Sequence, residues 1–323
     1  MAEMSKKIHF YDEEKLKNIN KDTMKLYGKY KVDMSLRDLS LKTVSGYDND
    51  LSHWFIYIYD NQGNQCITDL DEDDITEFLY YCKTEGNNTE RMKRRMSSIS
   101  AFYKFLRKKK IIKENPMEFI DRPKRGVSII TQTYLTKEQV ELMRQKLADY
   151  RNAGKLNGRE YQLYALFALS TMARVNAISN VKWDQIDFDN RVCNNVLEKE
   201  GRYVTLYFNQ EVKELLVETK EFRESKSIND GGYVFFNEVN GVPQPYQNGT
   251  LDKWCKKIGE MIGVPTLHNH DFRHSGANLY KNAGMKLEDV SDLLHHLSTD
   301  TTKRFYLKED ESKIQANKDK FNI

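Results

Sequence analysis

The sequence predicts a mainly α-helical protein of two domains, with a small antiparallel β-sheet in the second domain. Apolar residues recur at helical spacing along most of the chain, whereas the stretch 186–208 changes to the short alternating runs typical of strands. A basic segment with a proline, 121–126, separates the two helical regions. A chain of 323 residues is long enough for two domains that each bury a core.

The composition narrows the class of protein. Charged residues make up 31% of the chain, but the net charge is only +3, so any nucleic-acid site must come from local clusters. No apolar run predicts a signal peptide or a membrane span. The cysteines show no metal-ligand spacing; they are Cys66, Cys82, Cys193 and Cys255. We therefore expect a cytoplasmic protein without a metal site.

The first region predicts a small all-helical domain at 36–120. Residues 1–35 are polar and lysine-rich and predict an arm or an extra helix outside the core. Pro116 prevents the last helix of the domain from continuing. The expected helices start at Leu41 after a cap at Ser40, at Asp69 or Asp71, and at Thr89, and they run to Ile58, Cys82 and Leu106.

The helix that starts at Thr89 carries a cluster of basic residues. Arg91, Arg94, Arg95 and Ser98 are expected on the face opposite its apolar stripe, with Lys93 beside them. Such a face suits phosphate contacts and entry into a DNA groove. The alternative is a charged face that contacts only solvent, and the sequence of this helix alone does not distinguish the two.

Residues 121–132 predict a basic linker, 133–307 a second domain, and 308–323 a charged tail. Thr136 and Gln139 predict a capping box at the first helix of this domain. The expected strands are 186–188, 191–193, 196–198 and 203–208, with a hairpin turn at 199–202 and a further apolar run at 233–236. The other expected helices are 161–171, one within 172–183, 210–225, 251–262, 270–282, 286–295 and 300–306.

Two places in the second domain bear residues suited to phosphate chemistry. Arg174 stands between strongly apolar stretches, so a charged ligand or a carboxylate is expected beside it, the latter as an internal salt bridge. Near the end of the chain, a histidine can move protons, an arginine can hold phosphate oxygens and a tyrosine can act as nucleophile. These residues are His270, Arg273, His295 or His296, and Tyr306.

These residues give the chain a resemblance to the tyrosine recombinases, the phage-integrase family. The family's arginine, hairpin lysine, His-x-x-Arg box, second histidine and tyrosine are matched, in this order, by Arg174, Lys199, His270, Arg273, His296 and Tyr306. Residues 89–116 resemble the end of the family's helical core-binding domain. The resemblance spans residues 36–307 and implies a SAM-like core-binding domain followed by an α+β catalytic domain.

The resemblance implies a site-specific, integrase-like recombinase that cleaves and rejoins duplex DNA through a 3′-phosphotyrosine, without metal or cofactor. Arg174 and Arg273 would stabilise the phosphate, with His296 as a further donor. Tyr306 would attack the phosphorus, Lys199 would protonate the leaving 5′ oxygen, and His270 would exchange the tyrosine proton.

The resemblance also implies partners: double-stranded DNA with a specific site, and further copies of the chain, from dimer to tetramer, on that DNA. A nucleoid-associated protein of the cytoplasm is expected. The candidate DNA contacts lie at helix starts, on the basic helix face and in the linker; they are Lys42, Thr43, Thr89, Arg91, Lys93, Arg94, Arg95, Lys124 and Arg125.

Three positions depart from the family's pattern. Met172 stands near the first arginine where a glycine is usual, Ala177 replaces an acidic residue, and His295 replaces a glycine. The missing carboxylate at 177 would leave Arg174 less well held. A catalytically silent DNA-binding protein on the same scaffold, such as a phage-type repressor, is therefore the alternative function.

Overall fold

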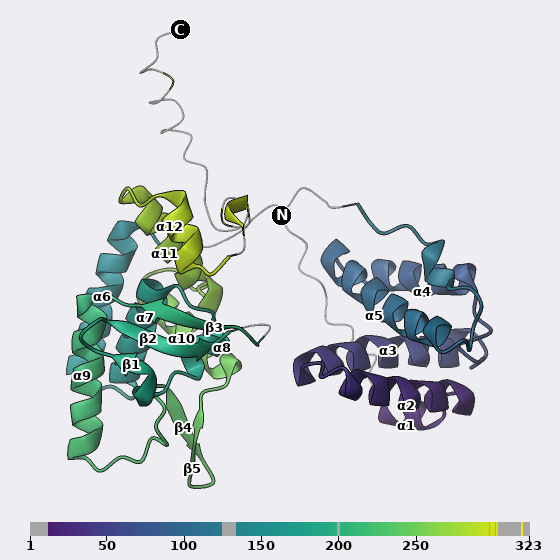
Figure 1. The fold of residues 1–323 in the computed structure, drawn as a ribbon, viewed down its shortest axis with the longest axis horizontal. Coiled ribbons are helices and arrows are strands. Elements are labelled where there is room, and N and C mark those ends of the chain that lie inside the picture. The colour runs from purple at the N-terminus through teal and green to yellow at the C-terminus, as the bar shows by residue number, and fades with distance from the viewer. Residues whose placement is uncertain are drawn as a thin grey trace. The chain divides into compact units, whose positions relative to one another are not determined.

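The structure is a computed structural model, and it describes residues 12–124, 134–198, 201–296, 298–300, 302 and 318. The chain divides into two compact units, Met1–Ile129 and Ile130–Ile323 (Figure 1). Arg125, Lys199 and Tyr306 lie outside the described residues. Within the described ranges, no helix is both long and apolar enough to cross a membrane.

The first unit is all-helical, as predicted. Its elements are α1 (Glu13–Lys17), α2 (Lys21–Leu36), α3 (Leu41–Asn61), α4 (Glu72–Thr84), α5 (Thr89–Lys108) and the short 3₁₀ helix η1 (Pro116–Glu118). The helices predicted to start at Leu41 and Thr89 are confirmed, and Asp71 rather than Asp69 caps α4. Asp71 does so in a reciprocal capping box with Asp74.

The α2 helix belongs to the core of the first unit. Tyr27, Tyr30 and Met34 are each at most 2% exposed. The ring of Tyr30 stacks on Phe102 of α5, with 5.1 Å between the ring centroids. The prediction that this region lies outside the core was therefore wrong for α2. These three buried residues share one helical face, and the lysines of α2 conceal that face in the composition.

The second unit combines helices with two small antiparallel sheets. Its helices are α6 (Lys137–Asn152), α7 (Gly158–Thr171), α8 (Val175–Ser179), η2 (Trp183–Gln185), α9 (Gln210–Ser225), α10 (Asn248–Met261), α11 (Asn269–Asn282) and α12 (Leu287–Leu293). Its strands are β1 (Ile186–Asp187), β2 (Val192–Leu197), β3 (Tyr203–Tyr207), β4 (Phe236–Val239) and β5 (Val242–Pro245). The first three form one sheet in the order β1-β2-β3, and the last two form a hairpin.

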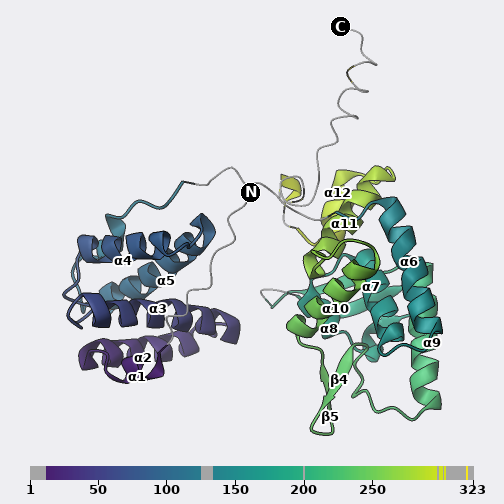
Figure 2. The ribbon, with the colours of Figure 1, turned by 180° about the vertical axis from the view of Figure 1, so that it is seen from behind.

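The strands differ from the prediction in two respects. The runs expected at 191–193 and 196–198 form the single strand β2, whose register shifts where Asn195 takes a positive φ of 54°. The β4–β5 hairpin was not predicted, although Asn240 and Gly241, both with positive φ, form the two-residue turn typical of hairpins. This hairpin extends from the helices in both views (Figures 1 and 2).

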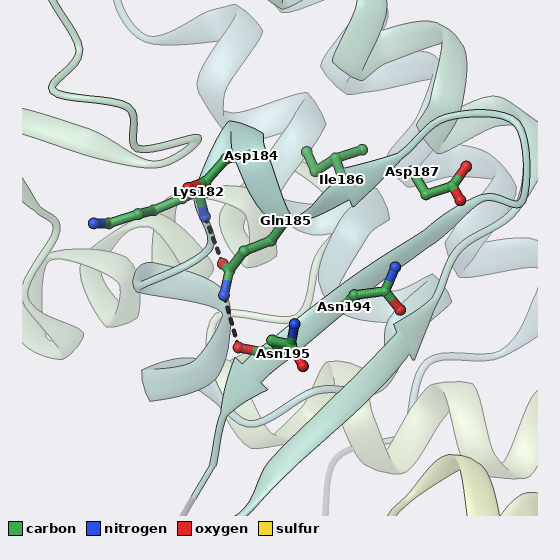
Figure 3. Close-up of a pocket in the computed structure, with 7 residues that line it drawn as sticks. All are labelled: Lys182, Asp184, Gln185, Ile186, Asp187, Asn194 and Asn195. Carbon is green, nitrogen blue, oxygen red and sulfur yellow. Dashed lines mark hydrogen bonds between the residues drawn. The ribbon is translucent and has the colours of Figure 1, made fainter.

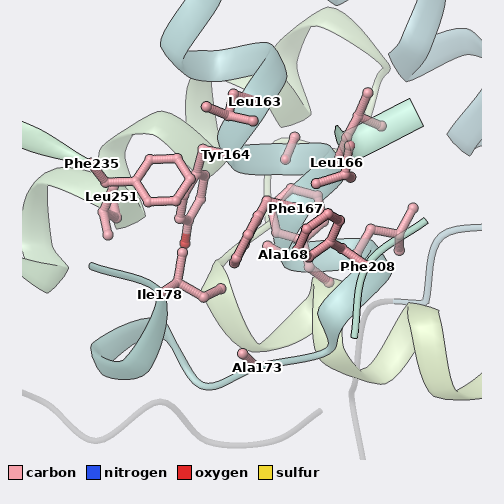
Figure 4. Close-up of a cluster of buried hydrophobic side chains, with 14 of the residues drawn as sticks. Leu163, Tyr164, Leu166, Phe167, Ala168, Ala173, Ile178, Phe208, Phe235 and Leu251 are labelled. Carbon is pink, nitrogen blue, oxygen red and sulfur yellow. The ribbon is translucent and has the colours of Figure 1, made fainter. Parts of the chain in front are cut away.

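The α7 helix is the centre of the second unit. Every residue from 163 to 171 is buried, and Phe167 packs against Phe208 and Phe235 (Figure 4). A helix that is apolar on all sides is expected to be surrounded, and α6, α9 and α11 pack around α7. This packing fixes the end of α7, from which the chain turns toward Arg174.

Candidate active site

Arg174 is placed by the turn at the end of α7. Met172 is completely buried and has a φ of 52°, in the left-handed region that glycine adopts most easily. Its N–H donates to the carbonyl of Ala168 at 3.0 Å, which closes the helix. The chain then leaves the helix in extended conformation, and Arg174 takes the N-cap position of α8.

Arg174 pairs with a carboxylate at the end of β2. Its Nη1 donates to Oε2 of Glu198, whose side chain is only 3% exposed, while the arginine side chain is 29% exposed. Burial raises the pKa of Glu198, but His295 and the charges of Arg174 and Arg273 lower it more, so that the pKa lies below its ordinary value. Glu198 is therefore a charged, buried partner of the arginine.

Arg273 forms hydrogen bonds to the ends of two helices. Its side chain is 1% exposed and projects from α11. Nη1 donates to the carbonyl of Met172 at 2.6 Å, and Nη2 donates to the carbonyl of Leu294 at 2.5 Å. Because both bonds end on backbone carbonyls, the guanidinium is held in one orientation between the end of α7 and the end of α12.

The end of α12 presents two neighbouring histidines in different directions. His295 has a φ of 52°, and the N–H groups of His295 and His296 donate to Asp292 and Ser291 at 2.9 and 3.1 Å, which is a Schellman motif. His295 thus occupies a backbone conformation that favours glycine. Its Nε2 lies 3.1 Å from the carbonyl of Thr205 on β3.

His296 contacts Arg273 directly. Burial, followed by the charges of Arg273 and Arg174, lowers the pKa of His296 to about 4, so the ring is neutral at neutral pH. Its Nε2 lies 3.1 Å from Nη2 of Arg273, and its Nδ1 lies 2.8 Å from Oγ1 of Thr302. Since an arginine only donates, Nε2 is the acceptor and Nδ1 carries the proton.

His270 lies one turn before Arg273 on α11 but is exposed. Its ring centroid is 6.5 Å from that of the buried His274. Burial, with the charges of His270 and Arg273, lowers the pKa of His274 to about 4. The His-x-x-Arg box therefore presents its histidine to solvent and its arginine to the interior.

The structure brings Arg174, Arg273 and His296 to one place, although they come from three elements. His270 shares the helix of Arg273, and Lys199 directly follows Glu198. The sequence predicted a carboxylate or a ligand beside Arg174, but no local pattern distinguishes Glu198 from the other acidic residues, of which the chain has 48 in all. Within the described chain, no group of three or more His, Cys, Asp or Glu side chains is arranged to hold a metal ion.

The basic face predicted on α5 is smaller than expected. Arg95 and Ser98 are each 1% exposed, so the prediction that they face outward was wrong. The guanidinium of Arg95 bonds to Oδ1 of Asn87 at 3.2 Å and contacts Nδ1 of His53 at 3.1 Å inside the unit. Residues three and four apart share a helical face, and the face of Arg95 turns toward the core.

The other predicted DNA contacts lie at the surface. Arg94 pairs with the buried Asp50 at 2.6 Å and is 51% exposed, and Lys93 pairs with Glu90 at 3.1 Å. Arg91 is half-buried. Besides Arg94, the exposed members of the set are Lys42, Thr43, Thr89 and Lys124.

A polar hollow at the edge of the first sheet contains none of the predicted residues. It lies beside the irregular register of β2, and the side chain of Gln185 crosses it (Figure 3). Gln185 accepts from the N–H of Lys182 at 2.9 Å and donates to the carbonyl of Asn195 at 2.8 Å. These bonds stabilise the sheet edge.

The chain matches two families of known domains. The phage integrase family matches residues 133–313, and the phage integrase N-terminal SAM-like domain matches residues 30–110. The tyrosine recombinase XerC of Lactobacillus delbrueckii subsp. bulgaricus is 28% identical over 272 residues, which cover 82% of this chain and 88% of that protein. XerC of Anoxybacillus flavithermus is 25% identical, covering 82% and 87%.

Solved structures show the same fold. The post-cleavage complex of the XerH site-specific recombinase with a palindromic difH substrate has a TM-score of 0.70 at 18% identity, covering 91% of this chain and 84% of that chain. The Tn1549 transposon integrase with circular intermediate DNA has a TM-score of 0.66 at 18% identity, covering 92% and 98%. A dimer of lambda integrase on a COC′ core site has a TM-score of 0.65 at 17% identity, covering 88% and 94%.

A SAM-like helical domain followed by this mixed domain defines the class of site-specific recombinases that break and rejoin DNA. The chain belongs to the phage integrase family, and its activity is that of a tyrosine recombinase acting on DNA.

Proposed function

We propose that strand transfer by this recombinase uses Arg174, Lys199, His270, Arg273, His296 and Tyr306, and proceeds through a 3′-phosphotyrosine. The convergence of Arg174, Arg273 and His296 at one place is the observation that supports this assignment. Two guanidinium groups in a largely buried setting form a site suited to a phosphodiester, because the negative charge of the transition state is stabilised by fixed donors.

The two arginines have different freedom to engage the phosphate. Arg273 is locked by backbone carbonyls, so it is the preorganised member of the pair. Arg174 uses Nη1 for Glu198 and is 29% exposed, so an arriving phosphate can reach its guanidinium. His296 supports this pair from the side of Arg273.

The proposed covalent step uses Tyr306 and Lys199, which lie outside the described residues. The hydroxyl oxygen of Tyr306 attacks phosphorus, the bond to the 5′ oxygen breaks, and Lys199 gives that oxygen a proton. The exposed His270 accepts the tyrosine proton and returns it when the strand is rejoined. The phosphotyrosine keeps the bond energy, so no nucleotide is consumed.

The test uses Tyr306→Phe and a nicked duplex whose sequence the chain itself selects from a random pool. We expect the parent protein to form a covalent adduct on a denaturing gel and Tyr306→Phe to form none, while both bind the duplex equally. Tyr80→Phe is the matched control, since Tyr80 is a 69% exposed tyrosine of α4. A parent protein that binds tightly and forms no adduct would support the catalytically silent alternative.

The proposed DNA surface in the first unit contains the surface residues of the predicted set and excludes Arg95. Its members are Lys42, Thr43, Thr89, Arg91, Lys93 and Arg94, continued by Lys124 and Arg125 in the linker. Replacing one phosphate contact weakens binding to all sequences and lessens the salt dependence.

The proposed assembly on a specific duplex DNA site is a dimer or tetramer, in the cytoplasm. The lambda integrase structure similar to this chain is a dimer on its core site. The polar C-terminal tail, with Ile314 and Phe321, is the proposed contact between copies. Gel filtration with DNA, comparing the whole chain with one truncated after Lys308, tests this role; identical assembly would reject it.

A further inference from the structure

Glu198 is a buried carboxylate on which three elements of the candidate active site meet. One oxygen, Oε2, accepts from Arg174 at the N-cap of α8. The other, Oε1, lies 3.7 Å from Nδ1 of His295, just beyond the end of α12. Glu198 directly follows β2 and precedes Lys199, so its side chain lies at the base of the hairpin, bonded to Arg174 and beside His295.

The backbone of Glu198 is fixed as well. Its N–H donates to the carbonyl of Arg202 at 2.8 Å, across the hairpin from β2 to β3. Its side chain is 3% exposed. A buried charge is retained only where other groups compensate it, and Arg174, Arg273 and His295 provide that compensation.

We propose that Glu198 is a positioning residue for strand transfer, which sets the guanidinium of Arg174 and the turn at His295 in the arrangement that engages the phosphate. This inference rests on the proposed function. Ala177 of α8 is 1% exposed and has only a methyl group, so its side chain cannot hold Arg174. The carboxylate comes instead from the strand that leads to Lys199.

The opposite role would be competition, in which Glu198 occupies Arg174 and must leave before DNA reacts. The contacts favour positioning for two reasons. The ladder bond and the burial keep Glu198 in place, and its contact uses one nitrogen of a guanidinium that has five N–H donors. The two roles predict opposite effects of removing the charge.

The experiment measures covalent adduct formation by the full chain on the nicked duplex that the parent protein selects. The variants are Glu198→Gln, which removes the charge at constant size, and Glu198→Asp, which keeps the charge on a shorter side chain. Glu218→Gln is the matched control, because Glu218 is a partly exposed carboxylate of α9 that pairs with Arg151 and Arg159. Thermal unfolding and DNA affinity are measured for each variant.

We expect Glu198→Gln to slow adduct formation at saturating DNA about 10- to 100-fold, the size of effect that misplacing a reacting group produces. Its DNA affinity should be unchanged, because the residue acts through the orientation of Arg174. Glu198→Asp should react faster than Glu198→Gln, and Glu218→Gln should react as the parent does.

Adduct formation by Glu198→Gln at or above the parent rate would overturn the positioning role and would support competition. A second outcome would also overturn the positioning role: the rate falls together with DNA affinity or stability, and Glu198→Asp reacts no faster than Glu198→Gln. A structural role of Glu198 would then explain the loss. A parent protein that forms no adduct would overturn the proposed function itself, and that outcome is distinct from both.

Discussion

Two residues occupy left-handed backbone at the turns that carry the site. Met172 and His295 both have a φ of 52°, a conformation that costs a residue other than glycine about 1 kcal/mol. Each turn is closed by backbone hydrogen bonds, and the carbonyl of Met172 also accepts from Arg273. The departures at these two positions therefore leave the turns intact, and Glu198 holds the arginine that the alanine at 177 cannot.

Buried histidines make stability depend on pH. Burial, and then the charge of Arg95, lowers the pKa of His53 from its ordinary value to about 4. Nδ1 of His53 must accept the hydrogen bond from Nη2 of Arg95, because an arginine only donates. A proton on Nδ1 would therefore bring two donors face to face. The unfolded chain binds a proton at His53 near pH 6.5, whereas the folded chain does not until about pH 4.

Stability from His53 is therefore present above pH 6.5 and is lost as the pH falls toward 4. We expect the difference in free energy of unfolding between the parent protein and His53→Gln to shrink by about 2 kcal/mol from pH 7 to pH 5. Urea unfolding at both values measures it. His268→Gln, at a 54% exposed side chain, is the control. An equal pH dependence of the parent protein and His53→Gln would contradict the assignment.

At the scale of elements, the contact between α11 and α7 sets the position of Arg273. A Cβ atom on Gly276 would lie 2.6 Å from the carbonyl oxygen of Leu169 and 2.6 Å from Cγ of Met172. Backbone atoms cannot yield cheaply at that distance, so the helices approach closely only because this residue is glycine. The bond from Arg273 to the carbonyl of Met172 depends on that approach.

Gly276→Ala should lower the free energy of unfolding by about 1–3 kcal/mol, the usual effect of overpacking, and should also slow adduct formation. Gly249→Ala is the matched control, since nothing lies within 4 Å of an added Cβ in this helical position. We expect it to be neutral or slightly stabilising. Equal effects of the two substitutions in urea unfolding would show that α11 can move away from α7.

The α5 helix has an inner and an outer arginine. Arg95 is 1% exposed and bonds inside the unit, whereas Arg94 is half exposed. A pattern of charges at helical spacing identifies a shared face, but it does not decide which arginine lies at the boundary with the core.

Arg95→Ala should therefore destabilise the protein by about 2–4 kcal/mol, because it leaves a cavity and removes partners from Asn87 and His53. Arg91→Ala, at a half-buried position on the same helix, should change stability by less than about 1 kcal/mol and should weaken DNA binding with a smaller salt dependence. Urea unfolding and a salt titration of DNA binding separate the two. If Arg95→Ala is as stable as the parent protein but binds DNA more weakly, Arg95 belongs to the DNA interface.

At the scale of the molecule, each unit has its own core. The buried apolar residues of the first unit and those of the second form separate clusters. We accordingly propose domain boundaries at 36–120 and 133–307, with a linker at 121–132, a tail at 308–323, and α2 added to the first domain because it packs there.

Limited proteolysis tests this division. We expect the first cuts within 121–132, because that segment offers trypsin two sites, after Lys124 and after Arg125, between two compact units. The measurement is the mass of the early fragments. Early cuts inside α5 or α7, with the linker protected, would contradict the proposed boundaries.

Local patterns let the sequence by itself determine most of the elements. Caps and apolar spacing predicted α3, α5 and α6, and the change of period predicted the β2–β3 hairpin, because these signals act between residues a few positions apart. The same patterns identified Arg174 as an arginine that needs a partner. The sequence also held the Asn240–Gly241 turn signal of the β4–β5 hairpin, which the prediction overlooked.

Only the tertiary structure decided which groups meet. Glu198 is 24 residues from Arg174, and the carbonyl of Met172 is 101 residues from Arg273, so no local rule selects them. The same holds for the burial of Arg95 and for the contact of His296, rather than His295, with Arg273. These contacts are set by the packing around α7 and by the turns that end α7 and α12, because together they fix where side chains from distant segments converge.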